Sequence, residues 1–238
     1  LAFGLGSGIF YIHIPFLKMN GGPAISFRSM PGSIFKRTCK VLNITSKHKR
    51  FRNISNAEKY LNNKISEGLV VGCQVGVFNL TYFPVEYRFH FNAHNIIVYD
   101  KTDSIYNISD PVMEKTTYLS IADLNKVRFS HGFLAPRGHI YFPINIPEIT
   151  KKTLQKAIIQ SIKRVTIQML RLPGNFVGVR GIKYTAKKIT KINKKIGERK
   201  TGIYLAQIVR MQEEIGTGGG GFRFLYAAFL EEAAEILN

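Results

Sequence analysis

One histidine and one aspartate carry the clearest chemical signal in the chain. His94 opens an apolar stretch, and Asp110 follows shortly after it and precedes a proline. A carboxylate that holds one nitrogen of an imidazole fixes the tautomer of the ring and leaves the other nitrogen free for proton transfer. The pair therefore predicts general acid–base chemistry. Such a site also needs a nucleophile, and the chain offers no obvious one.

The strands that would position this pair follow from the local pattern. Residues 94–99 and 104–109 both have the composition of strands, and a three-residue turn centred on Thr102 separates them. A hairpin with this turn pairs residues whose numbers sum to 204 and places His94 directly opposite Asp110. Opposed residues share a face of the sheet, with Cβ atoms about 5 Å apart. We therefore expect the two side chains to meet.

The first 149 residues are predicted to form a mixed, strand-rich half. A capping box that begins at Ser55 predicts a helix to about Ser66, and Ser120 is expected to cap a second helix that ends near Phe129. Besides the hairpin, strands are expected at residues 10–16, 69–80, 87–91 and 138–142, and turns at 20–23 and 30–33.

From residue 150 onward the apolar residues recur with the period of a helix. Thr150 is expected to cap a helix that runs to Leu172, and two further helices are expected at 201–214 and 222–237. Another helix between them should bury one face and carry its lysines on the other; the buried face would hold Ile182, Ala186, Ile189, Ile192 and Ile196. The prediction is an α+β chain, with an antiparallel sheet half over residues 1–149 and an all-helical lobe over 150–238.

The positive charge is concentrated in the predicted helices. The net charge is +19, and residues 151–212 hold 16 Lys and Arg against one acidic residue, Glu198. Such a field attracts an acidic partner, for example nucleic acid or an acidic carrier protein. A solvated helix face would show the same pattern without any partner, so both interpretations stay open. No apolar run approaches the roughly 18 residues of a membrane span. The two cysteines argue against a disulfide scaffold and suit a reducing compartment such as the cytoplasm.

The other motifs are weaker candidates for chemistry. Cys73 lies in a β-branched segment and is expected to be a buried structural residue, while Cys39 follows two basic residues but has no other feature of a nucleophile. The glycine-rich loop at 216–221 lacks the Lys-Ser/Thr ending of a phosphate-binding loop and is interpreted as a hinge or a close approach of backbone. The histidines show no metal-ligand spacing, so no metal site is expected.

Taken together, these segments resemble the butirosin-biosynthesis acyltransferase family, which joins a papain-like, cysteine-peptidase-type N-terminal half to a helical C-terminal region. The resemblance spans nearly the whole chain, and its C-terminal segment is the most distinctive. The matching segments are Phe3-Gly-Leu-Gly-Ser-Gly-Ile-Phe10, Ser29-Met-Pro-Gly32, His94-Asn-Ile-Ile-Val-Tyr99, Ser109-Asp-Pro-Val112 and Glu214-Ile-Gly-Thr-Gly-Gly-Gly-Gly-Phe-Arg-Phe-Leu-Tyr-Ala-Ala-Phe-Leu-Glu-Glu-Ala233.

The resemblance implies roles for individual residues. His94 and Asp110 match the histidine and aspartate of a cysteine-histidine-aspartate triad. The nucleophilic cysteine of the family precedes the Gly-Leu-Gly-Ser-Gly segment, so it is expected upstream of Leu1, which agrees with a sequence that begins in the middle of a pattern. Asp100 and Lys101 replace the Gly-Tyr that ends the family's strand. For the oxyanion, Gln74 is only a weak candidate.

The function implied is amide-bond formation in natural-product biosynthesis. An acyl group would pass from the thioester of an acyl carrier protein to the enzyme's cysteine and then to a small-molecule amine. No resident cofactor is expected, because phosphopantetheine arrives on the carrier. The carrier would meet the lysines of the basic helices, namely Lys187, Lys188, Lys191, Lys194 and Lys195. A papain-like cysteine peptidase or amide hydrolase would use the same triad, and a non-catalytic module that binds nucleic acid or protein is a second alternative.

Overall fold

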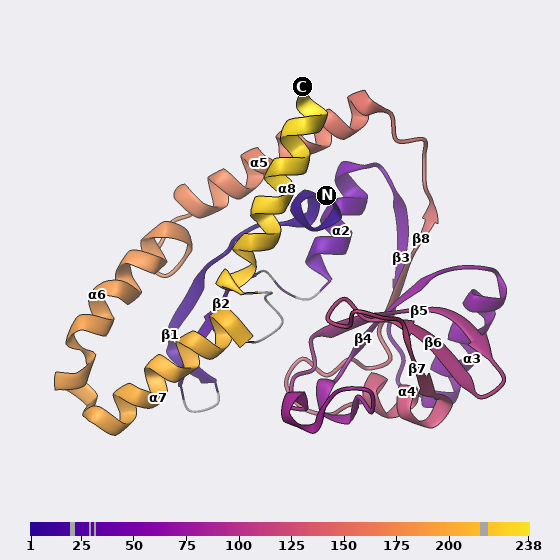
Figure 1. Ribbon diagram of the computed structural model, residues 1–238, viewed down its shortest axis with the longest axis horizontal. Coiled ribbons are helices and arrows are strands. Elements are labelled where there is room, and N and C mark those ends of the chain that lie inside the picture. Colours follow the sequence, from indigo (N-terminus) through magenta and orange to yellow (C-terminus); the bar gives the residue numbers. More distant parts are fainter. Residues whose placement is uncertain (20–21, 29, 31, 215–218) are drawn as a thin grey trace. The chain divides into compact units, whose positions relative to one another are not determined.

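The computed structural model describes residues 1–19, 22–28, 30, 32–214 and 219–238, and the chain forms two compact units (Figure 1). Unit 1 comprises Leu1–Ile44 and Pro147–Asn238, and unit 2 comprises Thr45–Ile146. The second boundary falls close to residue 150, where the helical pattern begins. The first 44 residues, however, pack with the C-terminal helices, so the compact units differ from the two sequential halves expected from the pattern.

Unit 2 is built on a six-stranded antiparallel sheet with the order β3-β8-β4-β5-β6-β7. Its strand β4 lies between two neighbours, and all five of its residues are buried, as expected for an apolar run without alternation. The strands are β3 (Thr45–Lys49), β4 (Val71–Val75), β5 (His94–Thr102), β6 (Ile105–Ser109), β7 (Thr117–Ser120) and β8 (Ile140–Asn145).

Two helices accompany this sheet, and their caps test the sequence prediction. Helix α4 (Ile121–Arg128) begins as predicted, with the Ser120 hydroxyl accepting from the amide of Asp123 at 3.0 Å. Helix α3 (Ile54–Ser66) begins earlier than predicted, because Asn53 rather than Ser55 is the capping residue. Apolar residues from both helices join one core with the inner face of the sheet; among them are Leu61, Leu124, Val127, Ile96, Ile108 and Ile140.

The strand predicted at residues 87–91 does not form. The chain there makes a short 3-10 helix, Val85–Tyr87, after Pro84, and no strand is assigned between it and His94. The guanidinium of Arg88 donates to two nearby carbonyls, those of Thr81 at 2.7 Å and Phe83 at 2.8 Å. These bonds hold Arg88 against the turn that precedes it, so the alternating pattern of the segment was misleading.

Unit 1 combines helices with one β-hairpin. The strand predicted at residues 10–16 is present but shifted, and its antiparallel partner was not predicted. The strands are β1 (Ile12–Met19) and β2 (Gly22–Ser26). The helices are α1 (Ala2–Gly6), α2 (Ser33–Val41), α5 (Lys151–Leu170), α6 (Gly178–Ile196), α7 (Glu198–Val209), continued by a π turn over Arg210–Glu214, and α8 (Arg223–Leu237). These bounds confirm the α+β class and a C-terminal region that is helical in sequence.

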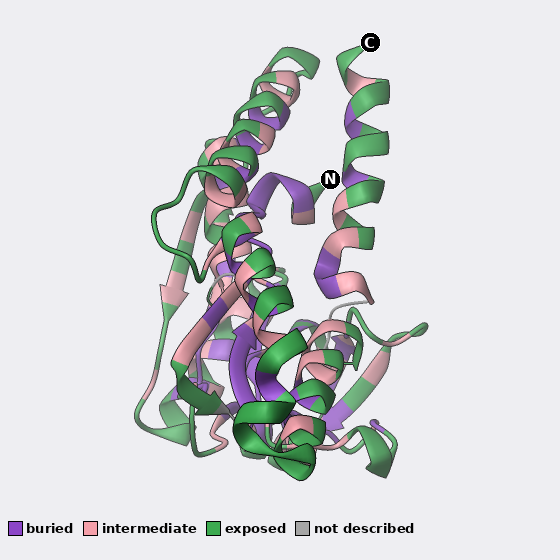
Figure 2. Cartoon of the chain, turned by 90° about the vertical axis from the view of Figure 1, so that its left-hand side faces the viewer, coloured by how far each residue is buried: buried purple, intermediate pink, exposed green. Residues whose placement is uncertain are grey.

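The long helices of unit 1 bury one side each, as Figure 2 shows for α8. Helix α5 matches its prediction closely, because Thr150 accepts from the amide of Thr153 at 3.2 Å and one side of the helix, with Ala157, Ile158, Ser161 and Val165, is buried. Residues 20–21, 31 and 216–218 of the expected turns and loop lie outside the described residues. In the described part of that loop, Gly221 has a φ of 62° and approaches the ring of Phe27 closely.

Helix α6 buries the predicted Ile192 but is rotated so that other predicted residues face outward. Its buried residues are Gly178, Gly181, Thr185 and Ile192, whereas Ile182 is 36% exposed and Ala186 is exposed. The reason is a polar contact: the hydroxyl of Tyr11 donates to Thr185 Oγ1 at 2.6 Å, and Gly181 leaves room for the Tyr11 ring. The orientation brings Lys188, which shares the inward side, next to the β1–β2 hairpin. None of the helices in the described ranges is long and apolar enough to cross a membrane.

The first helix of the chain is tightly enclosed. A Cβ on Gly4 would overlap the ring of Phe229, and a Cβ on Gly6 would overlap the carbonyl of Ile34. The carbonyls at its end are also held, since Ser161 donates to Leu5 O at 2.9 Å and Arg164 to Ser7 O at 3.0 Å. The glycines of this segment therefore serve close packing, with no need for a strained backbone.

Replacing Gly4 by alanine should destabilise unit 1 by about 1–3 kcal/mol, because the added methyl forces Phe229 out of its place in a packed core. Gly202→Ala is the matched control: Gly202 lies in α7, and a Cβ added there would meet no described neighbour within 4 Å. That change should stabilise the helix by up to about 1 kcal/mol. Urea unfolding followed by circular dichroism measures both, and equal effects of the two alanines would contradict the packing argument.

Candidate functional site

The hairpin that carries His94 and Asp110 differs in register from its prediction. Val98 pairs with Ile108 and Thr102 with Ile105, so the paired numbers sum to 206 and 207 rather than 204. The turn is formed by residues 103–104, and Asp103 adopts a φ of 51°. Aspartate tolerates this left-handed conformation better than most residues, which permits the tighter turn. The prediction of direct opposition was therefore wrong.

The two side chains nevertheless meet, because near the site the observed register differs from the predicted one by two residues, an even number. A shift of two residues keeps every side chain on its original face, and an irregularity between Val98 and Asp100 absorbs the odd residue of the turn. Asp110, just past the end of β6, is then a diagonal neighbour of His94. The result is a hydrogen-bonding distance of 2.7 Å between His94 Nε2 and Asp110 Oδ2.

The Asp110 carboxylate is buried and fully engaged. Its side chain is 0% exposed, Tyr82 donates its hydroxyl to Oδ2 at 2.7 Å, and the amide of Val112 donates to Oδ1 at 3.0 Å. Burial acts to raise the pKa of Asp110, but the bonds from His94, Tyr82 and Val112 outweigh it and leave the pKa below the ordinary 3.8. Burial and the neighbouring carboxylate raise the pKa of Tyr82, so this hydroxyl stays protonated and remains a donor.

The surroundings of His94 leave one nitrogen for chemistry. Its Nε2 is held by an ionised carboxylate, which accepts hydrogen bonds, so Nε2 carries the ring proton and Nδ1 is the basic nitrogen. Within the described ranges Nδ1 has no hydrogen-bond partner, and the side chain is 12% exposed. The edge of the ring packs against Phe83, with 5.8 Å between the ring centroids. This arrangement can take a proton at Nδ1 and stabilise the resulting cation through Asp110.

Tyr82 is the member of the site that sequence reasoning missed. It precedes Asp110 by 28 residues and belongs to no motif, so no local pattern connects the two. The only available signal was its position between apolar residues and Pro84, which is not specific.

Gln74 is not free to stabilise an oxyanion. Its side chain is 3% exposed, and its amide nitrogen donates to the carbonyls of Asn92 at 2.8 Å and Leu134 at 3.0 Å. Its oxygen lies 3.0 Å from His139 Nδ1. The side chain thus anchors the loops around β4, and the structure removes it as an oxyanion candidate.

The two cysteines are both buried. Cys73 lies in β4 at 0% exposure, and burial raises the pKa of its thiol, which disfavours the thiolate needed for attack. Cys39 lies in α2 and is 4% exposed. Neither has the partly exposed position of a reactive thiol. In the part of the chain that the structure describes, no group of three or more His, Cys, Asp or Glu side chains is placed to hold a metal ion.

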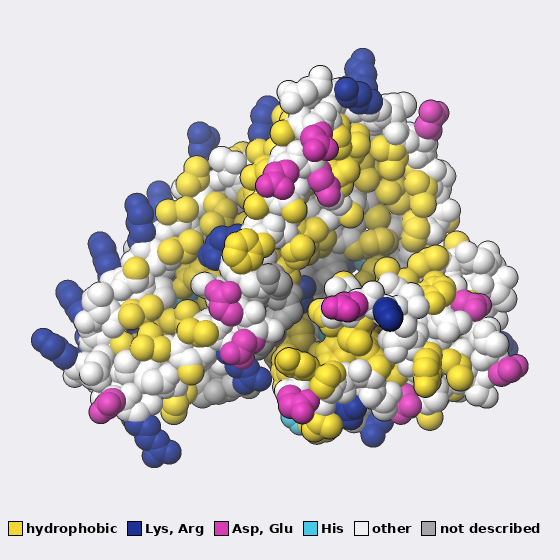
Figure 3. Space-filling model, viewed as in Figure 1, with side chains coloured by type: hydrophobic (Ala, Val, Ile, Leu, Met, Phe, Trp, Pro, Cys, Tyr) yellow, Lys and Arg dark blue, Asp and Glu magenta, His cyan; other side chains and the backbone are white. Residues whose placement is uncertain are grey.

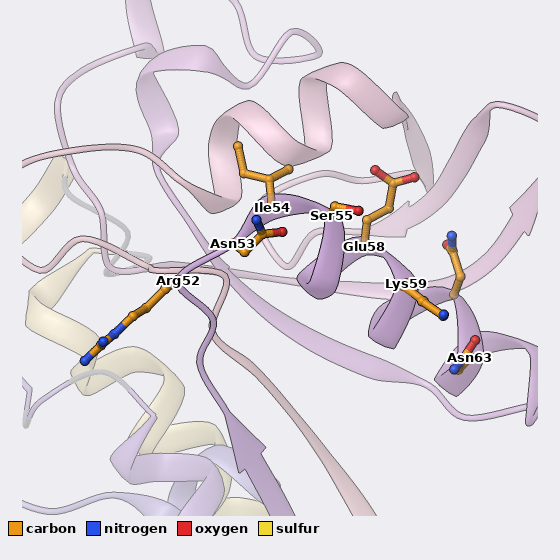
Figure 4. Close-up of a pocket in the computed structure, with 8 residues that line it drawn as sticks. Arg52, Asn53, Ile54, Ser55, Glu58, Lys59 and Asn63 are labelled. Carbon is orange, nitrogen blue, oxygen red and sulfur yellow. The ribbon is translucent and has the colours of Figure 1, made fainter.

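A depression at the start of α3, about 780 Å³ in volume, offers no comparable chemistry (Figure 4). Arg52 extends away from the helix, while Glu58, Lys59 and Asn63 lie along it (Figure 4). The Glu58 carboxylate accepts from Asn125 at 2.7 Å, which is a structural contact between helices. No histidine or cysteine is among the described residues that line this depression.

Four of the five lysines expected to bind a carrier line a single cleft of unit 1. These are Lys187, Lys188, Lys191 and Lys195, and they are joined there by Lys18 and Lys200. Lys194 is exposed and is not part of the described lining. Figure 3 shows Lys and Arg side chains projecting along the outer edge of α6, which accounts for the remaining positive surface of this helix.

Comparisons with known proteins match the chain in two segments. Residues 1–111, which include both His94 and Asp110, match the family described as butirosin biosynthesis protein H, N-terminal, and residues 122–238 match a domain of unknown function, DUF4872. No curated protein matches the chain. Among solved structures, a C39-like peptidase from Bacillus anthracis shares 10% identity over 56% of this chain and 72% of its own, with a TM-score of 0.37. Residues 1–111 of the chain are therefore similar to the N-terminal part of butirosin biosynthesis protein H.

Proposed function

We propose that this protein is a papain-like, cysteine-dependent acyltransferase that moves an acyl group from a carrier-protein thioester to an amine and so forms an amide. The observation that carries the proposal is the pair of His94 and Asp110, with a buried, ionised carboxylate on Nε2 and a free basic Nδ1. The similarity of residues 1–111 to a biosynthetic protein supports synthesis over degradation. We place the reaction in the cytoplasm, where a thiol nucleophile stays reduced.

The proposed reaction passes through an acyl-enzyme. His94 Nδ1 takes the proton of a cysteine thiol, and the thiolate attacks the thioester carbonyl. The tetrahedral intermediate collapses, the carrier thiol leaves, and His94 returns the proton to it. An amine then attacks the acyl-enzyme, His94 accepts the amine proton, and the enzyme thiol leaves as the amide forms. Asp110 stays ionised throughout and holds the ring.

Two components of this reaction come from outside the residues described. The proposed nucleophile is a cysteine thiol other than the buried Cys39 and Cys73. The phosphopantetheine arm belongs to the carrier, so the protein itself needs no resident cofactor. The acyl donor and the amine acceptor are its proposed partners, and the basic surface of α6, including exposed Lys194, is where an acidic carrier would be attracted.

Salt should weaken the reaction with a carrier-linked substrate and spare the reaction with a small thioester. The attraction between an acidic carrier and the lysines of α6 is screened, because the Debye length falls from about 10 Å at 0.1 M salt to about 3 Å at 1 M. The KM for the carrier-linked acyl group should rise several-fold over this range, while the KM for an uncharged small-molecule thioester should stay nearly constant. A parallel rise for both substrates would argue against carrier docking at the lysines.

A papain-like hydrolase is the second candidate, because the same histidine and aspartate can activate water. In the decisive experiment, protein that carries the proposed nucleophilic cysteine is incubated with an acyl-carrier thioester, with and without a primary amine. The mass of the intact protein and the identity of the small-molecule products are then measured. Acyl transfer predicts an acyl-enzyme adduct without amine and an excess of amide over free acid with amine. Free acid alone under both conditions would establish hydrolysis. Absence of both adduct and product would leave a non-catalytic binding module.

A further inference from the structure

A cleft in unit 1 combines lysines with an apolar wall, and the acid–base chemistry of His94 and Asp110 does not use this combination. It has a volume of about 840 Å³ and is lined by β1, β2, α6 and α7. Every charged side chain in its described lining is a lysine, and no carboxylate accompanies them. The six are Lys18, Lys187, Lys188, Lys191, Lys195 and Lys200.

The wall between these lysines is apolar and aromatic. Tyr184 and Tyr204 line it together with proline, leucine and isoleucine side chains from the hairpin and the two helices. Lys188 lies with its ammonium 5.0 Å from the centre of the Tyr204 ring, which fixes one cation against the aromatic wall. The cleft therefore combines a cationic rim with an apolar interior, and the matching ligand has an anionic group attached to an apolar body.

Two polar groups of the cleft are buried without a partner. His13 is 0% exposed and Tyr204 is 8% exposed, and neither His13 Nε2 nor the Tyr204 hydroxyl has a hydrogen-bond partner within the described ranges. Both side chains line the cleft. Buried polar groups are nearly always satisfied, by protein, water or ligand, so these two groups are available to a ligand that displaces the atoms covering them.

A hydrogen-bond chain makes the His13 group a donor. The buried hydroxyl of Tyr11 donates to Thr185 Oγ1 at 2.6 Å, and Thr185 Oγ1 lies 3.0 Å from His13 Nδ1. When Thr185 donates onward to Nδ1, the ring proton resides on Nε2. Burial, and then the charge of Lys188, lower the pKa of His13 to about 4, so the ring is neutral near pH 7. The cleft thus presents N–H, O–H and ammonium donors, all suited to an oxyanion.

The lysines also repel one another in the absence of an anion. Burial and the charge of Lys195 lower the pKa of Lys188, which shows that the cation is held in an unfavourable place. Six cations exceed what a single carboxylate can offset. A phosphate monoester carries about −1.5 to −2 charge at pH 7, and a diphosphate carries more. Lysine is a well-suited point charge for phosphate oxygens.

We propose that this cleft binds a phosphate or diphosphate ester with an apolar body. Its phosphate oxygens accept from the lysine rim, from His13 Nε2–H and from the Tyr204 hydroxyl, and its apolar body lies on the wall of Tyr184 and Tyr204. The site lies wholly in unit 1 and is independent of His94 and Asp110, which lie in unit 2. The proposal therefore stands or falls separately from the acid–base chemistry at His94 and Asp110.

Calorimetric titration with three probes tests the class of ligand. Geranyl diphosphate combines both features and should bind most tightly, inorganic pyrophosphate should bind at least tenfold more weakly, and octanoate should bind weakest. Equal affinity for octanoate and geranyl diphosphate would overturn the choice of phosphate. Equal affinity for both diphosphates would overturn the role of the apolar wall. Absence of binding by all three would overturn the site itself.

Matched variants locate the binding. The double variant Lys188→Gln with Lys195→Gln should lose at least tenfold in affinity for geranyl diphosphate, since two charged contacts disappear from the cleft. Lys151→Gln with Lys152→Gln removes the same charge from exposed positions of α5 and should change affinity less than twofold. Tyr204→Phe should cost several-fold while retaining the ring. Equal losses in both double variants would reduce the binding to general attraction by net charge and overturn the proposal. Competition with an acidic carrier protein gives a further test. The proposal would also be overturned if neither diphosphate displaced the carrier while the cleft variant alone lost carrier binding, because the lysines would then serve protein docking.

Discussion

His94→Ala should remove nearly all acyl transfer, with a loss of about 10³-fold or more in kcat/KM, whereas Asp110→Asn should lose about 10²-fold. The alanine removes the proton acceptor of both half-reactions, and general acid–base catalysis contributes about 10²–10⁴-fold. The asparagine keeps the base but replaces a charged acceptor on Nε2, so it disturbs the tautomer and the stabilisation of the imidazolium.

The controls for this comparison lie on the same hairpin. Asp103→Asn makes the same chemical change in the β5–β6 turn, where the residue is exposed and asparagine tolerates the positive φ, so activity should stay within twofold of wild type. Because Asp110 is buried, thermal unfolding of Asp110→Asn must show a folded protein before its rate is interpreted. Near wild-type rates in His94→Ala would end the proposal for this pair.

Tyr82 offers a graded variant of the same argument. Tyr82→Phe removes one donor from Asp110 Oδ2 and leaves the ring in place. The carboxylate keeps its bonds to His94 and Val112, and the lost bond acts on the rate only through Asp110, so the expected loss is about tenfold. The order His94→Ala, Asp110→Asn, Tyr82→Phe in decreasing effect would distinguish a base, its orienting carboxylate and a supporting donor.

The features that the sequence predicted well are those set by local chemistry. Helices α4 and α5 began at Ser120 and Thr150 because a side-chain cap needs only its own first turn. The meeting of His94 and Asp110 was also predictable, because the face of a strand residue depends on parity and survives a register error of two. The exact register was not, since it depends on whether the turn has two residues or three.

The features that the sequence missed are set by contacts between distant segments. Helix α6 buries Thr185 rather than Ile182 because Tyr11, 174 residues away, donates to its hydroxyl. Hydrophobic periodicity cannot show such a contact, and it favoured the isoleucine face. The same rotation brings Lys188 to the cleft wall, so the lysines that resembled a uniform solvated face divide into those that line the cleft and those, such as Lys194, that do not. Tyr82 was hidden for the same reason, being far from Asp110 in sequence.

Acidification from pH 7 to pH 4 should destabilise unit 1 by about 3 kcal/mol through His13 alone. The folded-state pKa of this buried ring is about 4, because burial and the charge of Lys188 disfavour its protonated form, while the unfolded chain takes up the proton at the ordinary histidine pKa of 6.5. The unfolded state therefore binds more protons between these values. The stabilising contribution is fully present above pH 6.5 and is lost as the pH falls toward 4, and the gap corresponds to about 3 kcal/mol.

Comparing pH profiles isolates this contribution from the carboxylates that titrate in the same range. His13→Gln keeps a polar side chain beside Thr185 but does not titrate. Between pH 7 and pH 4, the free energy of unfolding of this variant should therefore fall by about 3 kcal/mol less than that of the wild type. Urea unfolding followed by circular dichroism measures both. His131→Gln changes an exposed histidine and should follow the wild-type profile closely. The charged and titratable neighbours of His13, namely Lys188, Tyr184 and Tyr204, are unchanged in both variants. A His13→Gln profile parallel to wild type would show that the ring is readily protonated in the folded protein, and that the cleft is more hydrated than its burial indicates.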